Sequence, residues 1–194
     1  MVEETSWEDG VVAEGKEGDF WGGSLTDVKE IRTLIPPSKN VKLQITGFLL
    51  FDKYENGDDR NWKQIMLKFR VVEGVNVGGE VKYKGTIVSQ TLPYFANPNN
   101  YDYTKPFFGK GQFLIPLIQI VKATGIESPS MIKGGLTDAN AEQIGKSLEN
   151  KLIIGSIMQT KATVKDPETG KYVESGDLVN EVKFFKAVPD SALV

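Results

Sequence analysis

A period-two alternation at residues 61–72 is the feature that most constrains what this chain can fold into. Apolar side chains occupy one set of alternate positions, namely Ile65, Leu67, Phe69 and Val71. The positions between them hold Trp62, Gln64, Met66, Lys68 and Arg70. Such an alternation predicts a half-buried strand with its aliphatic face on a hydrophobic core.

The second face of this strand combines a large aromatic ring, a thioether and two cations, and two interpretations of it stay open. An open sheet face with an aromatic ring beside cations suits a base that stacks and a phosphate whose charge is neutralised. In the alternative, Trp62 packs beneath a loop, and Lys68 and Arg70 are ordinary solvated side chains.

The rest of the chain predicts a mainly β domain with a helical insert. Alternation and turn signals predict strands at 41–51, 62–72 and about 80–92, with a bulge or bend at Gly47. Helices are expected at 112–124, with Pro116 in the first turn and Gly125 as the stop, and at 138–150 with Thr137 as N-cap. Strands at 151–164 and 178–188, joined by a turn at 166–170, complete the order.

Composition excludes several kinds of chemistry. The 194 residues include no Cys and no His, which removes disulfides, thiolate zinc sites and imidazole-dependent catalysis. We therefore expect a protein that is not an enzyme and has no catalytic residue, cofactor or metal site. The chain has no apolar run of membrane-spanning length and no secretory signal, so we expect no membrane association and an intracellular location, which is the host cytoplasm if the source is viral.

Charge divides the chain into two parts. Residues 1–30 carry two Lys against nine acidic residues, a net of −7, whereas residues 31–194 carry a net of +4. We expect residues 1–30 to be an acidic, poorly ordered leader, and residues 31–190 to be the folded domain. The leader is either a solvated segment or an interaction tail.

The candidate nucleic-acid-binding residues follow from these elements. The second strand supplies Trp62, Lys68 and Arg70, and the third is expected to supply Lys82 and Lys84 on a neighbouring surface. A long aromatic loop at 93–108 is expected to add Tyr94, Phe95, Tyr101, Tyr103, Lys105 and Phe107, although some of these rings could instead cap the sheet. Lys110, between two glycines, is available to a phosphate.

One acidic segment suggests different chemistry. Asp52, Glu55, Asp58 and Asp59 lie close together, but the spacing of a calcium-binding EF-hand fails because its third and twelfth positions would be Tyr54 and Lys63. A metal-dependent nuclease remains the less favoured alternative function.

Five strands with a helical insert between the third and fourth is the order of an OB-fold, a five-stranded Greek-key barrel that binds oligonucleotides across its second and third strands. With this order, with Trp62 to Val72, with Phe107 to Gly125 and with the final hairpin, the chain resembles virus- and phage-type proteins that coat single-stranded DNA. The resemblance implies sequence-independent binding of single-stranded DNA, with RNA left open, and contacts with replication or recombination proteins. The oligomeric state is not predicted. A β-rich virion structural or assembly protein is the alternative.

Overall fold

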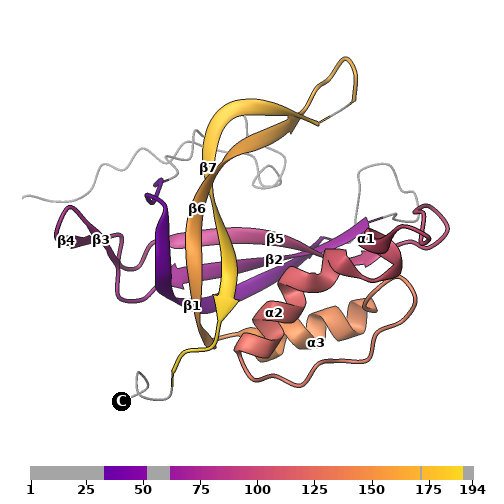
Figure 1. Ribbon diagram of the computed structural model, residues 1–194, viewed down its shortest axis with the longest axis horizontal. Helices are drawn as coiled ribbons and strands as arrows, with labels where there is room; N and C mark the ends of the chain where they lie inside the picture. The colour runs from indigo at the N-terminus through magenta and orange to yellow at the C-terminus, as the bar shows by residue number, and fades with distance from the viewer. Residues whose placement is uncertain (1–32, 52–61, 171, 190–194) are drawn as a thin grey trace, which may run out of the picture. The chain divides into compact units, whose positions relative to one another are not determined.

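A five-stranded antiparallel sheet organises the described part of the chain (Figure 1). The computed structural model describes residues 33–51, 62–170 and 172–189, which lie in one compact unit. The sheet has the strand order β5-β2-β1-β6-β7, and a separate two-stranded hairpin pairs β3 with β4. The strands are β1 (Ser38–Phe51), β2 (Trp62–Val71), β3 (Val75–Val77), β4 (Glu80–Lys82), β5 (Ile87–Ala96), β6 (Leu152–Lys165) and β7 (Tyr172–Lys186).

The helical insert lies between β5 and β6, the third and fourth strands of the main sheet. It contains α1 (Pro106–Gly109), the 3₁₀ helix η1 (Gln112–Leu114), α2 (Ile115–Ala123) and α3 (Asp138–Leu148). The expected mainly β domain with this insert is therefore confirmed.

The alternation in β2 is confirmed, because Ile65, Leu67, Phe69 and Val71 are all fully buried. Val41, Leu43 and Ile45 of β1 are buried on the same side. The expected irregularity at Gly47 is also present, since the β1–β2 register shifts between Ile45 and Gly47. The shift keeps apolar side chains inward on both sides of the bulge, because Phe48 then pairs with Leu67.

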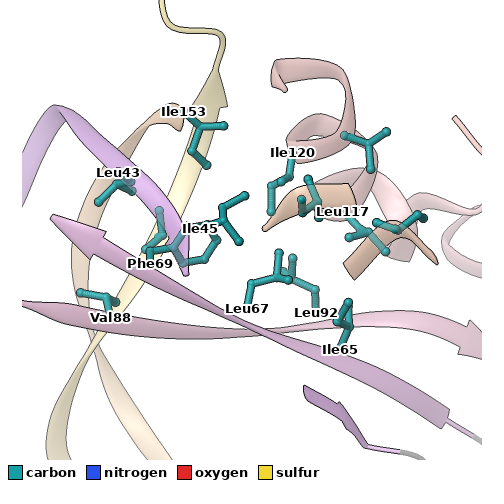
Figure 2. Close-up of a cluster of buried hydrophobic side chains, with 14 of the residues drawn as sticks. Leu43, Ile45, Ile65, Leu67, Phe69, Val88, Leu92, Leu117, Ile120 and Ile153 are labelled. Carbon is teal, nitrogen blue, oxygen red and sulfur yellow. The ribbon is translucent and has the colours of Figure 1, made fainter. Parts of the chain in front are cut away.

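The helices cover the inner side of this sheet. Leu117 and Ile120 of α2 join Ile45, Leu67 and Leu92 in one hydrophobic core (Figure 2). On the other helix, α3 contacts β1 closely, because a Cβ at Gly145 would overlap the Phe48 ring. Burial of apolar area of this kind stabilises a domain by roughly 25 cal/mol per Å² removed from water.

The residues expected to begin and end the helices are confirmed. Pro116 lies in the first turn of α2, where its missing N–H costs no helical hydrogen bond, and Gly125 follows the helix with φ of 68°. At the start of α3, Thr137 accepts a hydrogen bond from Asn140 N at 3.1 Å. Both helices are nevertheless shorter than expected, and α2 begins only after the separate turn η1.

The sheet does not close into the expected Greek-key barrel, which OB-folds form in a partly open version. β5 and β7 are the two edges of the sheet, and they approach each other through a side chain rather than through backbone pairing. Gln90 Oε1 accepts a hydrogen bond from Val182 N at 3.0 Å, and Gln90 Nε2 donates to Glu181 at 3.5 Å. The sheet curls far enough for a glutamine to span the gap, but not far enough for a ladder.

The third strand of the sheet differs most from expectation. It starts at Ile87 instead of about residue 80 and continues to Ala96, while residues 75–82 form the separate β3–β4 hairpin. Val81 and Ile87 are exposed, whereas Val88, Leu92 and Tyr94 are buried. β7 is also longer than expected, because it pairs with β6 from Tyr172 onward in a projecting hairpin (Figure 1).

Among the described residues, no helix is long and apolar enough to cross a membrane. The acidic leader expected at 1–30 lies outside the described residues, which begin at residue 33.

Candidate nucleic-acid interface

Strand pairing defines a continuous outer face on β1, β2 and β5, opposite the core. Arg70 pairs with Gln44 on one side and Ile87 on the other, and Lys68 pairs with Gly47 and Ser89. Since paired residues in adjacent strands point to the same side, their side chains share one surface. The outer face comprises Gln44, Gly47, Leu49, Phe51, Gln64, Met66, Lys68, Arg70, Ile87, Ser89 and Thr91.

The outer face is positively charged and partly apolar. Lys68 and Arg70 are exposed, and neither makes an ion pair within the part of the chain that the structure describes. None of the residues that define this face is acidic. Leu49, Phe51 and Ile87 are large apolar side chains that remain exposed beside the two cations. The face therefore offers two positive charges that no described residue pairs, within a surface that apolar groups can contact.

Trp62 lies at the end of β2 in a group of aromatic rings that we call the Trp62 cluster. Its ring centroid lies 5.5 Å from that of Phe113, 5.7 Å from Tyr101 and 6.2 Å from Phe108. The cluster comprises Trp62, Tyr101, Tyr103, Phe107, Phe108 and Phe113. Trp62 is half-buried within it, so the expected open stacking platform is replaced by a ring packed beneath the loop.

The segment expected as a long aromatic loop is partly strand. Pro93, Tyr94 and Phe95 belong to β5, and Tyr94 is 0% exposed. A base therefore cannot reach the Tyr94 ring, and its assignment to the binding site is wrong. Phe95 is half-buried, and the ammonium group of Lys63 lies 5.5 Å from its ring centroid, a cation–π geometry that further occupies this side chain.

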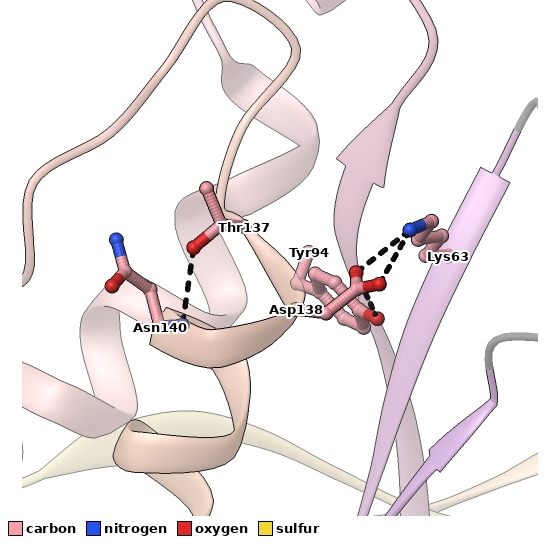
Figure 3. Close-up of polar contacts among 5 residues, drawn as sticks. All are labelled: Lys63, Tyr94, Thr137, Asp138 and Asn140. Atoms are coloured by element: carbon pink, nitrogen blue, oxygen red, sulfur yellow. Dashed lines mark hydrogen bonds and ion pairs between the residues drawn. The ribbon is translucent and has the colours of Figure 1, made fainter.

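Tyr94 and Lys63 instead meet at the start of α3 (Figure 3). Asp138 accepts hydrogen bonds from Lys63 Nζ at 2.7 Å on both carboxylate oxygens and from Tyr94 OH at 3.1 Å. An acidic residue in the first turn also interacts favourably with the helix dipole. The group fixes the N-terminus of α3 against β2 and β5.

The remaining loop residues surround the Trp62 cluster. Tyr103 OH donates to the Ala96 carbonyl at 2.7 Å, and burial raises the pKa of this phenol above its ordinary value. Tyr101 stacks on Phe108 with ring centroids 4.6 Å apart. Phe107 differs from both because it is 48% exposed, which makes it the ring of this group most accessible to a ligand.

Two further lysines of the loop remain at the surface. Lys105 is exposed and lies 4.0 Å from Asp102, an acid whose pKa is lowered by hydrogen bonds from the Thr104 hydroxyl and backbone N–H. Lys110 is exposed at the end of α1 and makes no ion pair with any described residue. Both positions are compatible with the expected phosphate contacts.

Lys82 and Lys84 do not lie on the sheet strand beside β2, which corrects their expected placement. Lys82 is in β4 of the separate hairpin, where it forms an ion pair with Glu80 at 2.8 Å, and Lys84 lies in the following turn. The side-chain pattern of residues 80–84 resembles a strand, but Gly85, with φ of 83°, interrupts it before β5 starts.

The outer face also includes residues that sequence reasoning did not select. Leu49, Phe51 and Ile87 were assigned to strands but not to a surface, since apolar residues are normally assigned to the core. For β1, the bulge expected at Gly47 indicates this placement. A bulge moves every later residue of the strand to the opposite side from the one that continuous alternation gives, so Leu49 and Phe51 point outward.

The described residues contain no group of three or more acidic side chains placed to hold a metal ion. The segment Asp52–Asp59 lies outside the described residues, so the nuclease alternative that rests on it stays untested.

Comparisons with known proteins give one partial similarity. The chain is 28% identical over 124 residues to the carbamoyl phosphate synthase small chain of Methanococcus vannielii, covering 62% of this chain and 31% of that protein. No family model matches, and no solved structure matches. Because the similar protein is a subunit of an enzyme, the expectation that this chain is not an enzyme is contradicted.

Proposed function

We propose that this chain binds single-stranded DNA independently of sequence, using the outer face of β1, β2 and β5. The observation that carries this proposal is the position of Lys68 and Arg70. Both are exposed, lack an ion-pair partner among the described residues, and lie between the exposed apolar side chains Leu49 and Ile87. RNA of the same length is the other ligand that this chemistry accommodates.

Each component of single-stranded nucleic acid has a complementary group on or beside this face. Lys68 and Arg70 neutralise phosphates, and Lys105 and Lys110 extend the positive charge past the Trp62 cluster. Unstacked bases lie against two exposed aromatic side chains, Phe51 of the outer face and Phe107 of the Trp62 cluster. The hydroxyl groups of Ser89 and Thr91 both donate and accept hydrogen bonds, so they do not select one base over another.

The order of strands supports an OB-fold-like origin for the domain. Its first sheet strand pairs with the second and the fourth, the second pairs with the third, and the helical insert separates the third from the fourth. In OB-folds the second and third strands carry the ligand face. In this chain those strands are β2 and β5, which provide most of the outer face.

The biological role we propose is coating and protection of displaced strands during DNA replication or recombination of a virus or phage. This role rests on the resemblance of the strand order and of residues 107–125 to proteins of that kind. It includes contacts with replication or recombination proteins. Binding at the outer face neither requires nor excludes a catalytic activity of the chain.

A fluorescence-anisotropy titration tests the binding directly. The purified full chain is titrated into a labelled oligothymidine of about 30 nucleotides at about 50 and 200 mM salt, with a duplex of equal length in parallel, since loss of affinity with added salt measures the release of counterions. We expect tight, salt-sensitive binding of the single strand and weaker binding of the duplex. Equal affinity for both, or binding of neither, would contradict the proposal.

A double variant locates the site. Lys68→Ala with Arg70→Ala should reduce the slope of log affinity against log salt by about 1.4, because each lost phosphate contact on a single strand contributes about 0.7. Lys146→Ala with Lys161→Ala removes the same charge from two side chains that are already ion-paired, to Glu142 and Glu174. This control should keep the original slope. Equal slopes for the two double variants would place the site elsewhere.

A further inference from the structure

The helical insert contains an apolar pocket that shares no residue with the outer face. Its volume is about 280 Å³, and it lies between α2, α3 and the segment that connects them. The principal lining side chains are Leu117, Ile118, Val121, Met131, Leu136 and Ile144. This volume is slightly below the range of about 300–1,000 Å³ that is typical of sites for drug-sized ligands. The pocket therefore has room for one or two large apolar side chains rather than for a larger molecule.

An apolar side chain of the pocket lining is accessible from outside. Met131 lines the pocket and is 59% exposed, and the next residue, Ile132, is 51% exposed. Exposed apolar residues that adjoin one another mark interaction sites more often than isolated ones do. Met131 is suited to such a site because its flexible thioether adapts to the shape of different partners.

The connecting segment is held in place before any partner arrives. Asn140 Nδ2 of α3 donates to the Ser130 carbonyl at 2.9 Å. Ile132 and Gly135 exchange two backbone hydrogen bonds, at 2.8 and 3.0 Å. A wall fixed in this way reduces the ordering entropy that binding would otherwise cost.

One lysine lines the pocket, and a second follows the lining residue Met131 closely in sequence. Lys122 lines the pocket, and Lys133 lies two residues after Met131; both are exposed and neither forms an ion pair with another described residue. The acids on the first turns of α3 are already paired, Asp138 with Lys63 and Glu142 with Lys146. Glu127 is the acidic residue next to the lining residue Ser128 in sequence, so these two lysines outnumber it.

From these contacts we infer that the pocket is a docking site for an acidic peptide segment of a partner protein, with one large apolar side chain of the peptide inserted between α2 and α3. Carboxylates beside the inserted side chain pair with Lys122 and Lys133. A nucleic acid fits less well, because the lining is apolar apart from Lys122 and Ser128 and offers few groups to a phosphate or a base edge. The inference does not depend on the proposed binding of single-stranded DNA.

Selection from a random library identifies the peptide preference without assuming a partner. The full chain is immobilised and panned with phage that display random 12-residue peptides, in parallel with the Met131→Asp variant, which places a carboxylate in the apolar lining. We expect wild type to enrich peptides with a large apolar residue flanked by Asp or Glu, and Met131→Asp not to enrich them. Absence of enrichment, or equal enrichment by the variant, overturns the inference.

Affinity measurements on the enriched peptide test each component. Replacing its apolar residue by Ala, or Met131 of the protein by Asp, should weaken binding at least about tenfold, as for the central residues of a protein interface. Lys122→Glu should also weaken binding and should reverse its dependence on salt, since attraction becomes repulsion. Tighter binding of a peptide with Lys in place of its acids would overturn the assignment of charge.

Matched variants separate the pocket from general effects. Met158→Asp makes the same substitution at an exposed methionine of β6, outside the pocket lining, and Lys39→Glu makes the same charge reversal on β1. Both should retain the affinity of wild type, and circular dichroism should show the same fold for all four variants. Loss of peptide binding in Met158→Asp and Lys39→Glu as well would show a nonspecific effect and overturn the inference.

Discussion

The two faces of β2 differ completely in burial and charge although they share one backbone. On the inner face, Phe69 is fully buried and its ring stacks on that of Phe185, with centroids 6.0 Å apart. On the outer face, the next residue, Arg70, is exposed and has no ion-pair partner among the described residues. The inner face determines whether the domain folds, whereas the outer face is free to determine what it binds.

The comparison shows why function can be placed on a strand at little cost in stability. A strand turns successive side chains to opposite sides, so a core residue and a ligand residue can be neighbours without competing for the same space. Trp62 lies between these extremes, because it belongs to the outer series of β2 but is half-buried in the Trp62 cluster. Variants at these positions measure how far the separation holds.

The largest effect is expected at Phe69. Phe69→Ala should lower the free energy of unfolding by about 3–5 kcal/mol, because it leaves a cavity in the core, whereas Arg70→Ala should change it by less than about 0.5 kcal/mol. Urea denaturation followed by circular dichroism measures both values.

The two positions should have the opposite order of effect on affinity for the oligothymidine. Arg70→Ala should weaken binding more than a substitution at Phe69 that preserves the fold. Phe69→Leu serves as the control, because it retains most of the buried volume and should lose much less stability than Phe69→Ala. If Arg70→Ala is as destabilising as Phe69→Ala, the two faces are not separate in function.

An intermediate effect is expected at Trp62. Trp62→Ala should cost about 1–3 kcal/mol of unfolding free energy, less than a fully buried aromatic, because the half-buried ring contacts Tyr101, Phe108 and Phe113. Trp62→Phe should recover much of that loss by keeping an aromatic contact. Urea denaturation gives these values, from the shift in midpoint concentration when the dependence of unfolding free energy on urea concentration is unchanged.

The same position can be monitored by its fluorescence. The other two tryptophans are Trp7 and Trp21, so Trp7→Phe with Trp21→Phe leaves Trp62 as the sole tryptophan emitter. Emission from Trp62 should then follow unfolding closely and change little on binding of the oligonucleotide. Strong quenching by the oligonucleotide, with no loss of stability in Trp62→Ala, would instead place this ring in direct contact with a base.

The smallest effect is expected at the tip of the β6–β7 hairpin, away from both faces. Backbone N–H groups of Glu168 and Thr169 donate to Asp166, which lowers the pKa of this carboxyl below its ordinary 3.8. Because the pKa is depressed in the folded state, the charged form contributes stability above the unfolded value of 3.8, and that contribution disappears as the pH falls through the lower folded value.

Thermal melts of wild type and Asp166→Asn isolate this contribution, since the amide keeps an acceptor but does not titrate. The difference in melting temperature should be present near pH 5 and shrink at the acid end of the range, below the unfolded pKa. A difference that stays constant from neutral to acid pH would show that the charge of Asp166 does not contribute to the stability of the turn.

The sequence alone determined most of the elements, because their signals are local. The alternation of Ile65, Leu67 and Phe69 follows from the backbone geometry of a single strand, and the cap at Thr137 depends on residues within one turn. The sequence also indicated that Lys68 and Arg70 share a surface, since they lie two positions apart on one strand. These features need no knowledge of what the strand packs against.

Only the tertiary structure decided which side chains meet. Tyr94 lies in the core because the strand β5 extends to Ala96, four residues past its expected end at residue 92, and the Tyr94 hydroxyl then donates to Asp138 of α3. Trp62 is covered because a loop some forty residues later in the chain folds back over it. The pocket on the helical insert likewise depends on how α2 and α3 pack together. Contacts between segments distant in sequence are set by packing of the whole domain, and no local pattern encodes them.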